Sequence, residues 1–189
     1  AVRELERAVG TLGLRGVEIG SHVGKRELGD EAFWPVYKAL EDLNVPIFIH
    51  PHHVAGMDRL QDFYLSNFIG NPLDTTIAAA QLIFSGVLEK FPGLKFILAH
   101  GGGQFPFIFG RMEHGYEVRP EAKEKVHQPP RTFVKNFYFD TITHNPDALR
   151  YLIAFAVSDH VLLGSDYPYD MADPDPVRTV SKLPRIKKG

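Results

Sequence analysis

The sequence PIFIHPHH, residues 46–53, decides the fold. An apolar run stops abruptly at His50, and Pro51 directly after it cannot donate a hydrogen bond to a neighbouring strand. Short apolar runs bounded by proline are typical of strands buried inside a parallel sheet. The stretch therefore predicts a buried strand that carries a histidine at its C-terminal end.

The same pattern occurs twice more along the chain. KFILAHGGG, residues 95–103, brings an apolar run to His100, and VLLGSDYPY, residues 161–169, brings one to Asp166. A β/α barrel collects catalytic groups from the C-terminal ends of different strands on one face. We therefore expect His50, His100 and Asp166 to lie together at one end of a sheet.

The segments between these runs have helical periodicity. Two further strands are predicted at residues 16–19 and 136–140. Helices are predicted at residues 2–12, from 33 or 34 to 43, around 59–63, from 71 to 90, at 105–113 and from 145 onward. Strand and helix alternate from the first strand onward, which favours an α/β fold with a five-stranded parallel sheet.

Composition limits the possible classes of function. The 189 residues are 44% hydrophobic with a formal charge of -2, which gives no electrostatic basis for binding nucleic acid or an anionic membrane. The absence of cysteine excludes disulfides and thiolate metal sites, so a bound metal must use histidine and carboxylate. No apolar run is long enough to span a bilayer. A cytoplasmic protein is expected.

The length is short for a complete barrel. A full β/α barrel takes about 250 residues, with roughly 200 near the lower limit. No linker or internal repeat marks a second domain. Residues 1–189 are therefore predicted to form one partial barrel domain.

The glycines after His100 suggest a second chemistry. HGGG is also an oxyanion-hole motif of serine esterases, which requires a G-x-S-x-G nucleophile turn downstream. Neither Ser158 nor Ser165 has glycine two residues to either side. A serine hydrolase is therefore excluded.

Five motifs together resemble a known family. HP (50–51), AHGGG (99–103), GR (110–111), DT (140–141) and GSDYP (164–168) follow one another along nearly the whole chain. In this order and spacing they resemble the amidohydrolase-related metalloenzymes of the aminocarboxymuconate-semialdehyde decarboxylase and γ-resorcylate decarboxylase type. The resemblance implies a (β/α)8 barrel with one divalent metal, most commonly zinc, with manganese as the alternative. Enzymes of this type decarboxylate small unsaturated or aromatic acids without using oxygen.

The resemblance also assigns roles at the strand ends. His50 matches the family's metal ligand on the fifth strand. Asp166 matches the aspartate on the eighth strand that binds the metal and takes part in catalysis. His100 matches the sixth-strand histidine that acts as acid and base. The family's H-x-H pair on strand one has no counterpart here. The chain is thus expected to correspond to strands four to eight, with strands one to three absent.

Four residues are expected to bind substrate. Arg111 matches an arginine that reaches the site of a neighbouring subunit and holds a substrate carboxylate, which implies a homodimer in the intact protein. Tyr169 matches an aromatic residue that closes over the substrate. His52 follows the metal ligand on the same loop. Asn67 stands near the place of a family tryptophan, so the substrate is expected to differ.

Three functions are compatible with these residues. The first is a metal-dependent decarboxylase of a small carboxylic acid. The second is a metal-dependent hydrolase of a lactone or amide, which needs the same metal ligands. The third is a non-catalytic remnant that acts as an interaction module, although the joint presence of His50, His100 and Asp166 argues against it.

Overall fold

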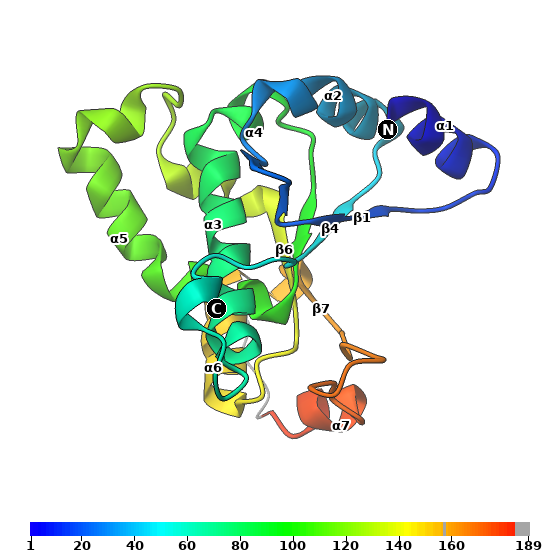
Figure 1. The fold of residues 1–189 in the computed structure, drawn as a ribbon, viewed down its shortest axis with the longest axis vertical. Coiled ribbons are helices and arrows are strands. Elements are labelled where there is room, and N and C mark those ends of the chain that lie inside the picture. The colour runs from blue at the N-terminus through cyan, green and yellow to red at the C-terminus, as the bar shows by residue number, and fades with distance from the viewer. Residues whose placement is uncertain (157, 184–189) are drawn as a thin grey trace.

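The computed structural model describes residues 1–156 and 158–183 as an α/β fold around one parallel sheet (Figure 1). The strands pair in the order β1-β4-β5-β6-β7, and every pairing is parallel. Their bounds are β1 Val17–Gly20, β4 Ile47–His50, β5 Phe96–Leu98, β6 Phe137–Asp140 and β7 Val161–Leu162. The predicted five-stranded sheet is confirmed.

The register brings the strand ends to the same edge. Ile49 pairs with Leu98, and Leu98 pairs with Phe139. The residues just beyond these pairs, including His50 and Asp140, therefore leave the sheet side by side. This alignment is what allows groups far apart in the sequence to form one site.

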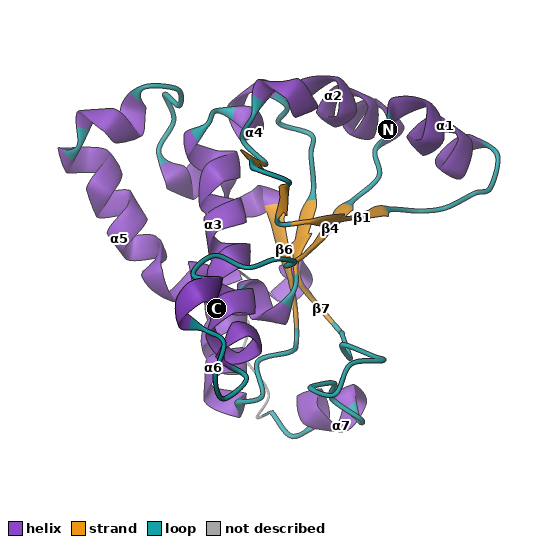
Figure 2. Cartoon of the chain, viewed as in Figure 1, coloured by secondary structure: helices purple, strands orange, loops and turns teal. Residues whose placement is uncertain are grey.

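Helices flank the sheet, and α7 lies beyond the end of β7 (Figure 2). The helices are α1 Val2–Gly10, α2 Trp34–Leu43, α3 Asn71–Phe84, α4 Val87–Lys90, α5 Phe105–Val118, α6 Pro146–Ala156 and α7 Pro176–Ser181. A small antiparallel hairpin, β2 His22–Val23 with β3 Arg26–Glu27, follows β1. None of the helices described is long and apolar enough to cross a membrane.

Alternate strand residues form the core. Ile47, Ile49, Phe96, Leu98, Phe137 and Phe139 are each 0% exposed. Phe105 at the start of α5 packs against the rings of Phe137 and Phe139, with ring centroids 5.2 and 6.4 Å away. The apolar strand residues thus fix the sheet, and the aromatic side chains of α5 hold that helix against it.

Two helix predictions are wrong. The helix expected over 71–90 is divided because Gly86 has φ of +80°, and a Cβ there would lie 2.3 Å from the carbonyl oxygen of Lys125. The helix expected over 59–63 is a single 3-10 turn, Met57–Arg59. Phe63 and Tyr64 have φ of 54° and 61°, which no α-helix accommodates. A π-helical turn, Ser66–Gly70, then leads into α3.

Candidate metal centre

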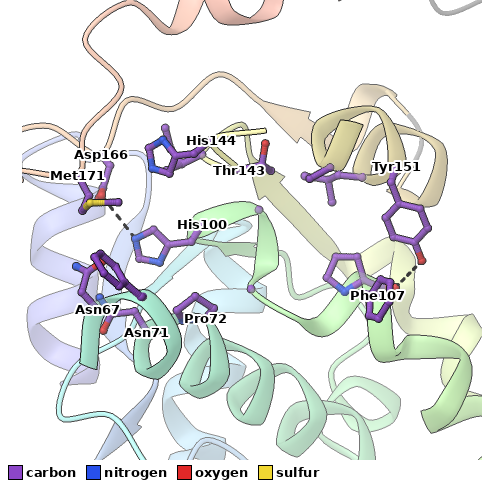
Figure 3. A pocket seen from close by; sticks show the side chains of 17 residues that line it. Asn67, Asn71, Pro72, His100, Phe107, Thr143, His144, Tyr151, Asp166 and Met171 are labelled. Carbon is purple, nitrogen blue, oxygen red and sulfur yellow. Dashed lines mark hydrogen bonds and ion pairs between the residues drawn. The ribbon is translucent and has the colours of Figure 1, made fainter. Parts of the chain in front are cut away.

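Three side chains from three strand ends meet at the C-terminal edge of the sheet. His50 ends β4, His100 follows β5 and Asp166 follows β7, and one possible ligand atom from each lies within 4.8 Å of the others. Nε2 of His50 and Nε2 of His100 are each 3.7 Å from an oxygen of Asp166. Figure 3 shows the His100 ring directed at Asp166. The predicted meeting of these residues is confirmed, whereas their roles stay predictions.

The backbone at the site adopts unusual conformations. His100 and Asp166 have φ of 57° and 59°, in the left-handed backbone region that residues other than glycine rarely adopt. Such conformations cost about 1–3 kcal/mol each and persist where surrounding contacts enforce them, often at functional sites. Gly103 makes the approach to α3 possible, because a Cβ there would lie 2.1 Å from the carbonyl oxygen of Pro72.

Asp140 holds the His100 turn in place. Its buried carboxylate accepts hydrogen bonds from the backbone N–H groups of His100 at 2.9 Å, Gly101 at 2.7 Å and Ile142 at 3.0 Å. Burial raises the pKa of the Asp140 carboxyl, and these N–H groups oppose that rise. Asp140 was not among the predicted site residues. Its position at the end of an apolar strand was the available signal.

The electrostatics favour a neutral His100. Burial lowers the pKa of the His100 imidazole below its ordinary value, with the charges of Asp140 and Asp166 acting in the opposite direction. At neutral pH the ring therefore has a lone pair available on one nitrogen.

The donor set fits a divalent metal. Nε2 of His50 is buried with no hydrogen-bond partner among the residues described, and it lies 3.7 Å from an oxygen of Asp166. Buried polar atoms without a partner are costly in a folded protein. Neutral imidazole nitrogens beside a carboxylate are ligands suited to zinc and also available to manganese.

Two cavities adjoin the cluster. The first, of about 700 Å³, is lined by His100 and Asp166 and extends to Phe107 and Tyr151 on α5 and α6 (Figure 3). The second, of about 380 Å³, is lined by His50 and by the loop after β4. The site therefore has room on both sides of Asp166.

The expected substrate-binding residues do not all lie here. Asn67 lines both cavities, and His52 lines the second. Tyr169 lines the second cavity as well, with its ring stacked on His50 at a centroid distance of 5.5 Å. Arg111 lines neither cavity and is exposed on α5. His144 also lines the first cavity.

A parallel β/α sheet that brings histidine and aspartate together at its C-terminal edge is the arrangement of barrel metalloenzymes. The particular family follows from sequence comparison. The profile of the family described as Amidohydrolase matches residues 1–183. The chain belongs to this amidohydrolase family.

The relatives with established names include decarboxylases. The 2-amino-3-carboxymuconate-6-semialdehyde decarboxylase of Dictyostelium discoideum is 36% identical over 184 residues, which cover 97% of this chain and 51% of that protein. The chain thus spans about half the length of the curated relatives it matches.

Solved structures agree with the fold. The 5-carboxyvanillate decarboxylase of Sphingomonas paucimobilis superposes with a TM-score of 0.88 at 30% identity, covering 98% of this chain and 57% of that one. A dihydroxybenzoic acid decarboxylase from Polaromonas, with bound manganese and the inhibitor 2-nitroresorcinol, has a TM-score of 0.86 at 24% identity. It covers 99% of this chain and 60% of its own. At that identity the second likeness shows the fold alone.

Proposed function

We propose that the intact protein containing this chain is a metal-dependent, non-oxidative decarboxylase of a small aromatic or unsaturated carboxylic acid. The observation that carries the proposal is the meeting of His50, His100 and Asp166 beside two cavities, both of which His100 and Asp166 line. The named decarboxylases among its relatives support the reaction class. We further propose that residues 1–189 are one domain corresponding to strands four to eight of the barrel.

His50 and Asp166 hold the metal, zinc in the first instance with manganese as the alternative. When bound, the metal supplies a Lewis acid next to the substrate. His100 is the catalytic acid and base beside it. As the carbon–carboxylate bond breaks, its electron pair stays on the substrate carbon and carbon dioxide leaves. His100, neutral at the start, takes up one proton from solvent at Nε2, the nitrogen that faces Asp166, and delivers that proton to the carbon, so that the ring is neutral again when carbon dioxide has left.

The cavities separate the reacting group from the rest of the substrate. The apolar body of the acid occupies the first cavity, where the side chains of Ile142, Leu152 and Met171 exclude water. Asn67 and His52 supply polar contacts at the rim. Tyr169 covers the site from the side of His50, on which its ring is stacked.

Arg111 acts in a neighbouring subunit. Its guanidinium forms no ion pair with any residue that the structure describes, and it lies on the exposed face of α5. Phe107, four residues before Arg111 on the same helix, is 81% exposed and offers an apolar side chain to a partner subunit, whereas Phe105 and Phe109 are buried in the subunit's own core. We therefore propose a homodimer in which Arg111 enters the partner's site and holds a substrate carboxylate.

Replacement of Arg111 by alanine should lower turnover by roughly 10- to 100-fold, the loss of a hydrogen bond to a charged group. Metal content should not change, because Arg111 lies away from the ligands. Turnover and metal analysis of the intact protein check both statements. Mixed dimers with a His100→Ala variant should recover part of the activity, since one of their two sites keeps both residues. Absence of rescue in demonstrated mixed dimers would place Arg111 within its own subunit or outside the reaction.

The reaction class is tested by its products. The intact protein is incubated with small aromatic and unsaturated carboxylic acids, and carbon dioxide is measured together with the organic product. We expect one carbon dioxide for each acid consumed. A hydrolysed lactone or amide without carbon dioxide would instead establish the hydrolase alternative. A folded, metal-loaded protein inactive on both classes would leave the interaction module.

A further inference from the structure

The loop that follows the metal-ligand strand is held through its backbone at three successive points. The N–H of His52 approaches Oγ of Ser21 at 3.4 Å, and the N–H of Ala55 donates to Oδ1 of Asp74 at 2.9 Å. Between them, the carbonyl oxygen of His53 lies 3.1 Å from Nε2 of His22. Residues 51–55, the His50 loop, are thus held by groups from the start of the hairpin and from α3.

His22 can satisfy its contacts in only one protonation state. Its Nδ1 lies 2.9 Å from the carbonyl oxygen of Gly24, and its Nε2 faces the carbonyl oxygen of His53. A carbonyl oxygen accepts hydrogen bonds and cannot donate them. Neutral imidazole has one N–H, so only the imidazolium donates at both positions. The geometry therefore requires a positive charge on His22.

A buried counter-charge stands beside this ring. Asp74 is 5% exposed, accepts the hydroxyl hydrogen of Ser21, and places Oδ2 4.0 Å from Nε2 of His22. Glu27 on β3 adds a second negative charge, and the rings of His52 and His53 are the other titratable groups on the loop packed against it. The hydrogen bond to the His53 carbonyl is the largest cause that raises the pKa of His22.

The held loop has a strained conformation and forms a cavity wall. His53 has φ of 54°, a left-handed conformation that costs free energy for a side-chain-bearing residue. The contact from His22 to its carbonyl oxygen is positioned to stabilise that conformation. The same loop supplies His52, His53 and Val54 to the lining of the second cavity, next to His50.

We propose that Ser21, His22 and Asp74 form a charged clamp on the His50 loop, with His22 as a doubly protonated positioning residue. The clamp holds the loop in the shape that lines the cavity beside the metal site. His22 itself touches the loop backbone and not the substrate. The effect on substrate binding rests on the proposed function, whereas the charge state of His22 and its hold on the loop do not.

The clamp gives a pH dependence of known sign. Because the pKa of folded His22 lies above its ordinary value of 6.5, the clamp is fully charged below that pH. It is lost as the pH rises through the folded pKa. Nitrogen-detected NMR of the 189-residue chain with ¹⁵N-labelled histidine should show protons on both His22 nitrogens and a midpoint above 6.5. The amide signals of His53 and Ala55 should shift with the same midpoint.

Variants separate the clamp from a general change in the fold. Asp74→Asn should lower the His22 midpoint, and Glu27→Gln should lower it less, because Glu27 is the weaker of the two charges acting on the ring. His127→Gln serves as the control, because it removes another histidine that is paired with a carboxylate, Glu89, but is exposed. It should leave the His22 midpoint unaltered. Titration of His22 below 6.5 in the unaltered chain, or loop amides that do not follow it, would overturn the proposal without requiring any variant to fold.

Activity then tests the positioning role separately. In the intact protein, KM should rise roughly three- to tenfold as the pH passes through the His22 midpoint, the loss of about one hydrogen bond, with kcat changed less. His22→Gln should have a raised KM without this pH step. An NMR titration as expected together with a pH-independent KM would reject the role in substrate binding and retain the charged clamp. Failure of decarboxylation itself would reject the proposed function and leave the NMR result unaffected.

Discussion

The His100→Ala variant of the intact protein is expected to lose about 10²- to 10⁴-fold in turnover, the usual contribution of a positioned acid or base. The physical reason is that burial lowers the pKa of the His100 imidazole, and that its Nε2 faces Asp166, beside which we propose that the substrate binds. Its metal content should stay at the level of the unaltered protein, because His50 and Asp166 remain. Steady-state rates and elemental analysis of the same preparation check the prediction.

His144→Ala provides the matched control for this variant. His144 lines the same cavity, but it is not one of the three residues whose ligand atoms cluster. We expect its removal to change turnover less than tenfold, as for a residue without a role in proton transfer. If His100→Ala lost metal and activity together, His100 would be a ligand, and the proton would have to come from another group.

The largest effect on stability is expected at Phe105. Its side chain is 0% exposed, and its ring lies 5.3 Å from Phe109 and 5.2 Å from Phe137. Phe105→Ala should lower the free energy of unfolding by about 3–5 kcal/mol, because the apolar contacts are lost and a cavity remains. Denaturant unfolding followed by circular dichroism measures the difference.

Phe107→Ala is the control on the same helix. Phe107 is 81% exposed in the single chain and two residues away, so its removal should change the unfolding free energy of the dissociated subunit by no more than about 0.5 kcal/mol. Equal losses for the two variants would contradict the packing described for α5.

The sheet, and the edge at which His50, His100 and Asp166 meet, were predictable because they depend on local pattern. Each of the three apolar runs that predicted the site is only two to four residues long in the structure, yet each brings its polar residue to the same edge. The parallel arrangement followed from alternation of strand and helix, and it does not depend on exact helix bounds. The helix predicted from residue 145 onward likewise begins where expected, with Pro146 as the first residue of α6.

The remainder depends on contacts between distant segments. Asp140 accepts a hydrogen bond from the N–H of His100, which is forty residues away in the sequence, and no local pattern specifies that bond. The division of the helix at Gly86 depends on its approach to Lys125. No local pattern predicts the contacts of His22 with His53 and Asp74, because these contacts exist only after the hairpin packs against the His50 loop.

The most direct test of the metal centre is a crystal of the intact protein loaded with zinc or manganese, measured at the absorption edge of that metal. We predict one anomalous peak, from a metal ion bound by a nitrogen of His50 and an oxygen of Asp166. The distance from a zinc ion to each of these ligand atoms should be about 2.0–2.2 Å, and the His100 ring should lie beside the ion. A peak elsewhere, or none at these residues in metal-loaded protein, would contradict the assignment.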